Sequence, residues 1–89
     1  MYRVEWTSQF KKDYKKIIKQ GKADIVDSMI EKLARNETLE ERHRDHALFG
    51  LYQGHRECHI SPDLLLIYKK YEHILVLICV RVSSHSELF

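Results

Sequence analysis

The spacing of hydrophobic positions changes along the chain and predicts two helices ahead of a series of strands. Residues 2–6 alternate between apolar and charged side chains, which is typical of a strand. Thr7 or Ser8 can cap the helix that follows, and Gly21 is a natural stop for it. The apolar stripe of this helix consists of Phe10, Tyr14, Ile17 and Ile18. The first quarter of the chain therefore predicts a strand and an amphipathic helix.

A second amphipathic helix follows and ends near Arg35 or Asn36. Its apolar side consists of Ile25, Val26, Met29, Ile30 and Leu33. Because only a short turn separates the two helices, they are expected to pack against each other as a helical hairpin.

After a polar stretch at 37–46, which is expected to be a loop, the hydrophobic period becomes two. The expected strands cover 48–52, 55–60, 64–68 and 74–82, with turns at 53–54, 61–63 and 69–73. The last strand is apolar on both faces, which places it in the centre of the sheet. The element order β-α-α-β-β-β-β predicts an α+β fold, with the helical hairpin packed on one face of a largely antiparallel twisted sheet.

Composition narrows the class of protein. The chain has 89 residues, 44% of them hydrophobic, which predicts one folded domain over residues 1–89. It has no apolar run long enough to span a membrane and no secretory signal at its start. Two cysteines do not indicate a disulfide framework, so Cys58 and Cys79 are expected to be buried, reduced thiols. These features predict a cytoplasmic protein without a membrane partner.

Charge is distributed unevenly. Residues 1–22 hold seven Lys or Arg side chains against two acidic ones, although the net charge of the whole chain is only +2. Lys11, Lys12 and Lys15 lie on the polar face of the first predicted helix. They are candidates for binding a polyanion or an acidic protein partner, and a solvated helix face is an equally good interpretation.

Titratable side chains concentrate in residues 56–63, RECHISPD. Strand alternation puts Arg56 and Cys58 on one face and Glu57 and His59 on the other. The face of Cys58 is expected to turn toward the helices, so that Glu57 and His59 point to the open face. Asp63 can return near them at the turn.

The C-terminal stretch adds Arg81, His85 and Phe89. A His–carboxylate pair can remove a proton, a second His can donate one, and an Arg can hold a developing anionic charge. Single-stranded RNA suits these groups, because its 2′-OH can attack the neighbouring phosphorus and its bases stack on aromatic rings. Scattered surface histidines and carboxylates on a binding sheet are the alternative.

The sequences RDHALFG at 44–50, RECHISPDLLLIY at 56–68 and HSELF at 85–89, together with Gly54 and Arg81, resemble the YafQ-like branch of the RelE/ParE toxin superfamily. The resemblance covers the whole chain. It implies the toxin of a bacterial type II toxin–antitoxin pair, an endoribonuclease that cuts messenger RNA, commonly in the ribosomal A site, and needs no metal or other cofactor. It also implies a cognate antitoxin that wraps the toxin and blocks its site.

The resemblance also implies roles for individual residues. His85 and His59 resemble the proton-transfer pair, and Glu57 and Asp63 the carboxylates that assist them. The remaining matches are Arg81 for binding phosphate, Phe89 for stacking on a base and His46 for contacting substrate. Two departures concern Glu57, where some relatives have Asp, and Leu64, where some have Trp; both bear on substrate preference.

Structural alternatives accompany these roles. Arg81 can form an ion pair with Glu57 or Asp63, and Asp63 can be a turn residue only. His43 is expected in a solvated loop and His73 in a turn. The histidine and cysteine spacings do not favour a metal site, because alternation separates Cys58 from His59. A rival function is a ParE-like toxin that binds DNA gyrase without cleaving anything; a third is an antitoxin-binding partner whose activity has decayed.

Overall fold

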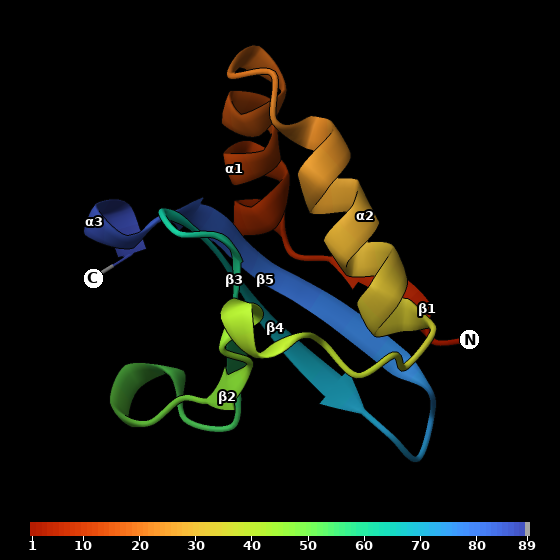
Figure 1. Cartoon of the computed structure of the whole chain (residues 1–89). Coiled ribbons are helices and arrows are strands. Elements are labelled where there is room, and N and C mark those ends of the chain that lie inside the picture. Colours follow the sequence, from red (N-terminus) through yellow and green to blue (C-terminus); the bar gives the residue numbers. More distant parts are fainter. Residues whose placement is uncertain (89) are drawn as a thin grey trace.

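The computed structural model describes residues 1–88 and has two layers, a helical hairpin above a five-stranded sheet (Figure 1). The elements in chain order are β1 (Arg3–Trp6), α1 (Ser8–Lys19), α2 (Ala23–Ala34), the 3-10 turn η1 (Glu41–His43), β2 (His46–Ala47), the 3-10 turn η2 (Gly50–Tyr52), β3 (Arg56–Ser61), β4 (Leu64–Tyr71), β5 (Val76–Ser84) and α3 (His85–Leu88). The predicted α+β class and the position of the hairpin on one face are confirmed.

The strand order in the sheet is β1-β5-β4-β3-β2. Only β1 and β5 pair in parallel; every other neighbouring pair is antiparallel. A parallel pair requires a long crossover between its strands, and the hairpin α1–α2 lies in that crossover. The prediction that the last strand is central is confirmed, because β5 lies between β1 and β4.

The helical hairpin follows from local sequence signals. The Thr7 hydroxyl accepts a hydrogen bond from the Phe10 amide at 3.0 Å and so caps α1. Gly21 has a φ of +71°, a left-handed conformation that glycine adopts at low cost, and it ends the first helix. The Tyr14 hydroxyl donates to Asp27 Oδ1 at 2.6 Å, which joins the two helices and raises the pKa of Tyr14 to about 12.

The core lies between the hairpin and the sheet. Its most deeply buried members are Phe10, Val26, Leu33, Cys58, Leu66, Tyr68, Leu77, Cys79 and Val82. Burying a side chain of this size stabilises a fold by roughly 1.5–3 kcal/mol. The predicted burial of both cysteines is confirmed, and burial raises the pKa of the Cys79 thiol to about 12 and that of Cys58 further still. Neither thiol is therefore a candidate nucleophile.

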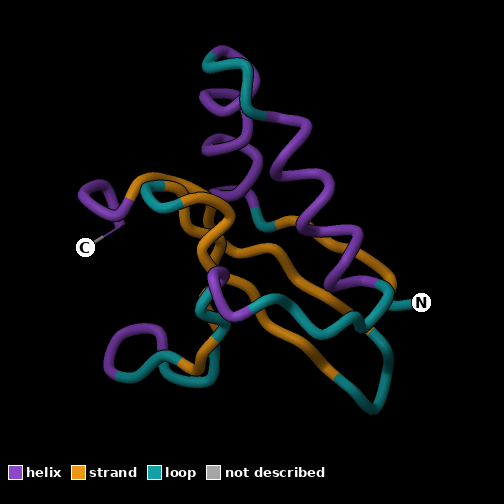
Figure 2. Tube along the Cα trace, in the orientation of Figure 1, coloured by secondary structure: helices purple, strands orange, loops and turns teal. Residues whose placement is uncertain are grey.

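The prediction of a strand at 48–52 is wrong. The strand in this region is β2, only two residues long, and η2 follows it; the stretch between α2 and β3 is mostly loop (Figure 2). Gly50 adopts a φ of +71°, which interrupts an extended chain, and Phe49 and Leu51 are exposed instead of packed. Hydrophobic residues alone therefore did not define a strand here.

The chain end also differs from expectation. β4 continues to Tyr71 and β5 starts only at Val76, with Leu75 at a φ of +53° in the turn between them. The predicted turn position of His73 is confirmed. After β5 the chain forms α3, a short helix that the hydrophobic pattern did not predict. Within residues 1–88, no helix combines the length and hydropathy needed to cross a bilayer.

Candidate functional site

Glu57 is a buried carboxylate that faces two histidines. Its side chain lies on β3, 5% exposed, and its Oε1 atom is 3.6 Å from His46 Nε2 and 3.5 Å from His59 Nε2. The β2–β3 pairing sets His46 directly opposite Glu57, and His59 follows two residues later on the same face. Both distances exceed the 2.7–3.2 Å range of an N–H···O hydrogen bond, so each imidazole contacts the carboxylate without being locked to it.

The loop before β2 positions the two histidines. His46 Nδ1 donates to the Arg44 carbonyl, and His43 Nδ1 donates to the His59 carbonyl at 2.6 Å. A carbonyl only accepts, so each Nδ1 carries a proton and the His46 Nε2 atom can take up another in front of Glu57. The prediction of a solvated His43 is wrong: it is 7% exposed, because η1 packs against the end of β3.

Asp45 anchors the same loop on the other face of β3. The Tyr68 hydroxyl donates to Asp45 Oδ1 at 2.5 Å, and Arg56 Nε donates to the same atom at 3.3 Å. Burial and this hydrogen bond raise the pKa of Tyr68, which keeps its hydroxyl protonated. The structure therefore places Arg56, a predicted substrate contact, beside Asp45 on the face opposite Glu57.

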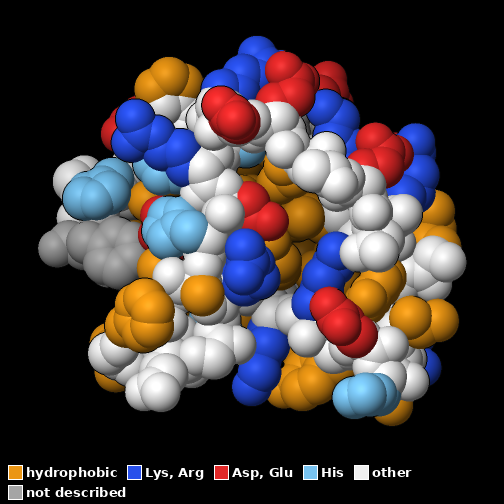
Figure 3. Space-filling model, turned by 60° about the horizontal axis from the view of Figure 1, so that its bottom comes forward, with side chains coloured by type: hydrophobic (Ala, Val, Ile, Leu, Met, Phe, Trp, Pro, Cys, Tyr) orange, Lys and Arg blue, Asp and Glu red, His pale blue; other side chains and the backbone are white. Residues whose placement is uncertain are grey.

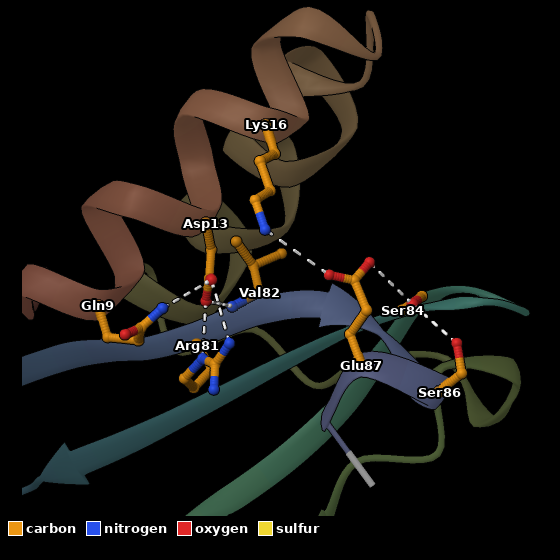
Figure 4. A network of polar contacts seen from close by, with 8 residues as sticks. All are labelled: Gln9, Asp13, Lys16, Arg81, Val82, Ser84, Ser86 and Glu87. Carbon is orange, nitrogen blue, oxygen red and sulfur yellow. Dashed lines mark hydrogen bonds and ion pairs between the residues drawn. The ribbon is translucent and has the colours of Figure 1, made fainter.

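Arg81 is held by Asp13 of α1, as Figure 4 shows. Arg81 Nε donates to Asp13 Oδ2 at 2.8 Å and Nη2 donates to Oδ1 at 3.1 Å; the Val82 amide donates to Oδ2 at 3.2 Å. β1 pairs with β5 only as far as Cys79, so Asp13 supplies the hydrogen-bond partner that a strand would otherwise give Val82. Asp13 is the ion-pair partner of Arg81, instead of Glu57 or Asp63.

Arg81 also interacts with Tyr52, and its two partners together affect its charge. Hydrogen bonds to Asp13 and then to Tyr52 raise the pKa of its guanidinium, which stays charged. Tyr52 belongs to η2, so Arg81 joins α1 to the loop below the sheet. Sequence reasoning missed Asp13, although a signal was present: it lies three residues after Phe10 and four before Ile17, on the buried stripe of α1. An acidic residue in such a stripe needs a buried partner.

The sheet register aligns the site residues across the strands. One row consists of His46, Glu57, Ile67 and Arg81, and the neighbouring row consists of His59, Leu65 and Ser83. Ile67 and Leu65 are fully buried and form an apolar floor. Neighbouring strands lie about 4.8 Å apart, so the backbones of β3 and β5 are about 10 Å apart across that floor. Some of the histidine side chains lie close together at the left of the face shown in Figure 3, and another lies apart from them at its lower right.

His85 lies at the start of α3, two residues beyond Ser83 on the β5 side of the floor. α3 is held in place by Glu87, which accepts a hydrogen bond from Ser84 at 3.2 Å and lies 4.0 Å from Lys16 Nζ (Figure 4). The fold thus places Glu57, His59 and His46 on β2 and β3 at one side of this floor and Arg81 on β5 at the other, and His85 follows β5 at the start of α3. Phe89, the predicted stacking residue, lies outside the described residues.

Besides Arg56, four predicted residues lie away from Glu57 and Arg81. Asp63 is exposed in the β3–β4 turn and lines a cavity of about 260 Å³ together with Lys16 and Glu87. Lys11, Lys12 and Lys15 are exposed on α1, in the layer on the other side of the sheet from Glu57. Cys58 faces the core, so it lies on the other face of β3 from His59, as strand alternation predicted. Among residues 1–88, no three His, Cys, Asp or Glu side chains are arranged to hold a metal ion.

Comparison with known proteins gives the class of this fold and site. Residues 2–89 match the family model described as the bacterial toxin of type II toxin–antitoxin system, YafQ. The chain is 33% identical over 88 residues to the mRNA interferase toxin YafQ of Escherichia coli K12, covering 97% of this chain and 94% of that protein. It is a toxin of the type II toxin–antitoxin class.

Two solved structures share the fold over the full length. The crystal structure of a metal-bound toxin from Helicobacter pylori is 38% identical with a TM-score of 0.90 and covers 100% of both chains. In the E. coli DinJ–YafQ complex, the matching chain is 31% identical with a TM-score of 0.88, covering 100% of this chain and 99% of that one. The chain belongs to the YafQ family, and the predicted family resemblance is confirmed.

Proposed function

We propose that this toxin is an endoribonuclease that cleaves messenger RNA by attack of a ribose 2′-OH on the adjacent phosphate, with one domain carrying the whole site. The observation that carries the proposal is the buried carboxylate of Glu57 between His46 and His59, in the same row of the sheet as Arg81. His85, the second proposed proton-transfer residue, begins α3 directly after the strand that carries Arg81. The name of the E. coli relative, an mRNA interferase, supports the same reaction.

The chemistry requires two proton transfers. One histidine of the pair His59 and His85 removes the 2′-OH proton as the oxygen bonds to phosphorus. The other donates a proton to the 5′-oxygen that leaves, giving a 2′,3′-cyclic phosphate and a 5′-hydroxyl. Glu57 orients His59 and stabilises its protonated form, and Asp63 assists from the β3–β4 turn. The charged guanidinium of Arg81 stabilises the negative charge that develops on the phosphate oxygens.

Further residues would bind the substrate. His46 and Phe89 contact the RNA near the cleaved bond, and Arg56, Lys11, Lys12 and Lys15 attract its phosphates. The ribosomal A site is the expected place of cleavage, which is a prediction from the family resemblance. A cognate antitoxin that covers this surface is supported by the relative solved with DinJ. The reaction is proposed to occur in the cytoplasm and without a cofactor.

The test uses purified protein and a defined message, with and without ribosomes, and maps new 5′ ends by primer extension with a chelator present. The His85→Ala variant is expected to cleave at least about 100-fold more slowly, because general acid–base catalysis typically contributes 10²–10⁴-fold. His73→Ala removes an exposed histidine of the β4–β5 turn and serves as the matched control. Both variants should keep the wild-type circular dichroism spectrum and bind the antitoxin.

Full cleavage by His85→Ala would contradict the proposed roles. Absence of cleavage by the wild-type protein under every condition would contradict the reaction itself. A supercoiling assay with DNA gyrase, run in parallel, then tests the ParE-like alternative, since a toxin that acts by binding gyrase needs no proton-transfer groups.

A further inference from the structure

A basic cavity lies beside the proposed catalytic histidine. It has a volume of about 520 Å³ and is lined by residues 42–44 of the loop that begins in η1 and by residues 59–62 at the end of β3. His59 therefore lines this cavity with one part of its surface and faces Glu57 with its Nε2 atom. The volume is within the range of small-molecule sites, so the cavity can take a group as large as a nucleotide.

The charge of the lining favours an anion. Arg42 and Arg44 contribute two guanidinium groups, and the seven lining residues include no carboxylate. Arg42 pairs with Glu40 at 3.3 Å, but both side chains are well exposed, and such surface pairs are weak enough to exchange for a phosphate. Within residues 1–88, no carboxylate lies within ion-pair distance of Arg44. Guanidinium groups bind phosphate oxygens in a planar, two-pronged geometry.

His43 gives a second, independent indication of a ligand. It lines the cavity, is almost fully buried, and donates its Nδ1 proton to the His59 carbonyl. Its Nε2 atom has no hydrogen-bond partner among the described residues. In the neutral imidazole this atom is an acceptor, and buried polar atoms are nearly always paired. In that form a ribose hydroxyl or a base amino group in the cavity could donate to it if the ligand reaches this buried atom.

We propose that this cavity binds a nucleotide one position beyond the two that share the cleaved phosphate, with Arg42 and Arg44 on the phosphate that links it to them and His43 on its sugar or base. The inference rests on the proposed ribonuclease function and adds a subsite to it. Because His59 lines the cavity, a nucleotide seated there would hold the neighbouring ribose and phosphate beside the catalytic imidazole. Binding energy from this subsite would then position the reacting bond.

The experiment compares RNA substrates of different length, built around a cleavage site mapped with the wild-type protein. The minimal dinucleotide is extended by one nucleotide on the 5′ side or on the 3′ side. Extension on one side is expected to raise kcat/KM about 10-fold in the wild-type toxin. In the Arg42→Gln/Arg44→Asn variant this gain should disappear while cleavage of the dinucleotide is unchanged. Asn is chosen because Arg44 has a φ of +45°, which Asn tolerates.

A binding measurement gives a second readout. This measurement uses a 2′-O-methyl oligonucleotide that cannot be cleaved. Log affinity decreases with log salt concentration, and the magnitude of this slope should be smaller by about 0.7 for each phosphate contact that the variant loses. The matched control is Arg3→Gln/Arg35→Gln, which removes two exposed arginines away from the cavity. It should keep both the gain from substrate extension and nearly all of the salt slope.

The possible failures are distinct. Cleavage with no gain from extension, or a gain that survives in the Arg42→Gln/Arg44→Asn variant, overturns the subsite and leaves the ribonuclease proposal intact. A wild-type toxin that neither cleaves nor binds RNA overturns both. A variant that loses antitoxin binding while its RNA kinetics and salt slope are unchanged also overturns the subsite, and assigns the two arginines to the protein interface.

Discussion

Asp13 and Glu57 are two carboxylates with the same exposure, 5%, in opposite surroundings. Asp13 accepts four hydrogen bonds at 2.8–3.2 Å, two from Arg81 and one each from Gln9 and the Val82 amide. Glu57 faces two imidazoles at 3.5 and 3.6 Å. One carboxylate is fully paired with a permanent cation; the other faces two groups whose charge depends on protonation.

This difference in partners indicates different roles: Asp13 positions other groups, whereas Glu57 can take part in proton transfer. A carboxylate saturated by a guanidinium and a backbone amide keeps its charge and its place, so Asp13 fixes Arg81 and the end of β5. A carboxylate beside titratable imidazoles can stabilise a proton when it arrives on either of them. Burial alone therefore does not distinguish the roles of the two residues, whereas the partners do.

The largest expected effect is on stability. Asp13→Asn should lower the free energy of unfolding by about 3 kcal/mol, the lower end of the range for removing one partner of a buried ion pair, because a quarter of the Arg81 side chain is exposed. Urea denaturation followed by circular dichroism measures the change. Asp24→Asn, in the exposed first turn of α2, is the control and should cost less than about 0.5 kcal/mol.

A double variant sharpens this test. Asp13→Leu combined with Arg81→Met replaces the ion pair by apolar side chains and should recover most of the lost stability, since such replacements are often neutral or stabilising. It should not recover RNA cleavage, because the phosphate-binding charge is gone. If Asp13→Asn left the free energy of unfolding unchanged, the four hydrogen bonds of Asp13 would not make it a stabilising residue.

The sequence predicted the regular parts of this architecture. The period and caps of the two helices, the central β5, and the separation of Cys58 from Glu57 and His59 all follow from alternation and helical spacing. β2 escaped prediction because two residues are too few for any period. α3 escaped it because a helix of one turn carries no amphipathic pattern and depends on contacts of Glu87 with Lys16 and Ser84.

The candidate site was predictable where its residues are neighbours in a strand and not where they come from distant segments. Glu57 and His59 share a face by alternation alone. The Asp13–Arg81 pair joins residues 68 positions apart, and the burial of His43 depends on how η1 packs against β3. Such contacts depend on tertiary packing, which a single sequence shows only indirectly, through an acidic residue in an otherwise apolar stripe.

The second prediction concerns activity. Glu57→Gln should slow RNA cleavage about 100-fold, equivalent to about 2.7 kcal/mol of transition-state stabilisation, because the protonated His59 loses its carboxylate. Its free energy of unfolding should change by less than about 1 kcal/mol, since removing a buried charge offsets the lost contacts. Single-turnover cleavage kinetics and urea denaturation measure the two quantities, with Glu72→Gln of the β4–β5 turn as control.

The Glu57→Asp variant tests whether catalysis depends on the negative charge of residue 57 or also on the length of its side chain. It keeps the negative charge but shortens the side chain by one methylene, so its cleavage rate should lie between those of the wild type and Glu57→Gln. The Glu57→Gln protein could instead be strongly destabilised and still cleave normally once folded. That result would mean that Glu57, like Asp13, serves stability, and that the two carboxylates do not differ in role.

The smallest effect concerns Asp45, a third carboxylate, whose side chain is 29% exposed and accepts a hydrogen bond from the Tyr68 hydroxyl. Tyr68→Phe should lower the free energy of unfolding by about 1 kcal/mol, because water can replace the lost donor at a partly exposed acceptor. The pKa of Tyr68 is raised by burial and by Asp45, so the hydroxyl is protonated in the folded state and the bond is intact below pH 10.

The stability difference between wild type and Tyr68→Phe should consequently stay constant from pH 6 to 9 and be lost only as the pH rises through the raised pKa, above about 10. Urea denaturation at several pH values measures it. Cleavage should fall by less than about 3-fold, since the Arg44 carbonyl still holds His46 in front of Glu57. A loss of activity as large as that of Glu57→Gln would mean that His46 is positioned through Asp45, and that a partly exposed carboxylate controls the site more than its hydrogen bonds indicate.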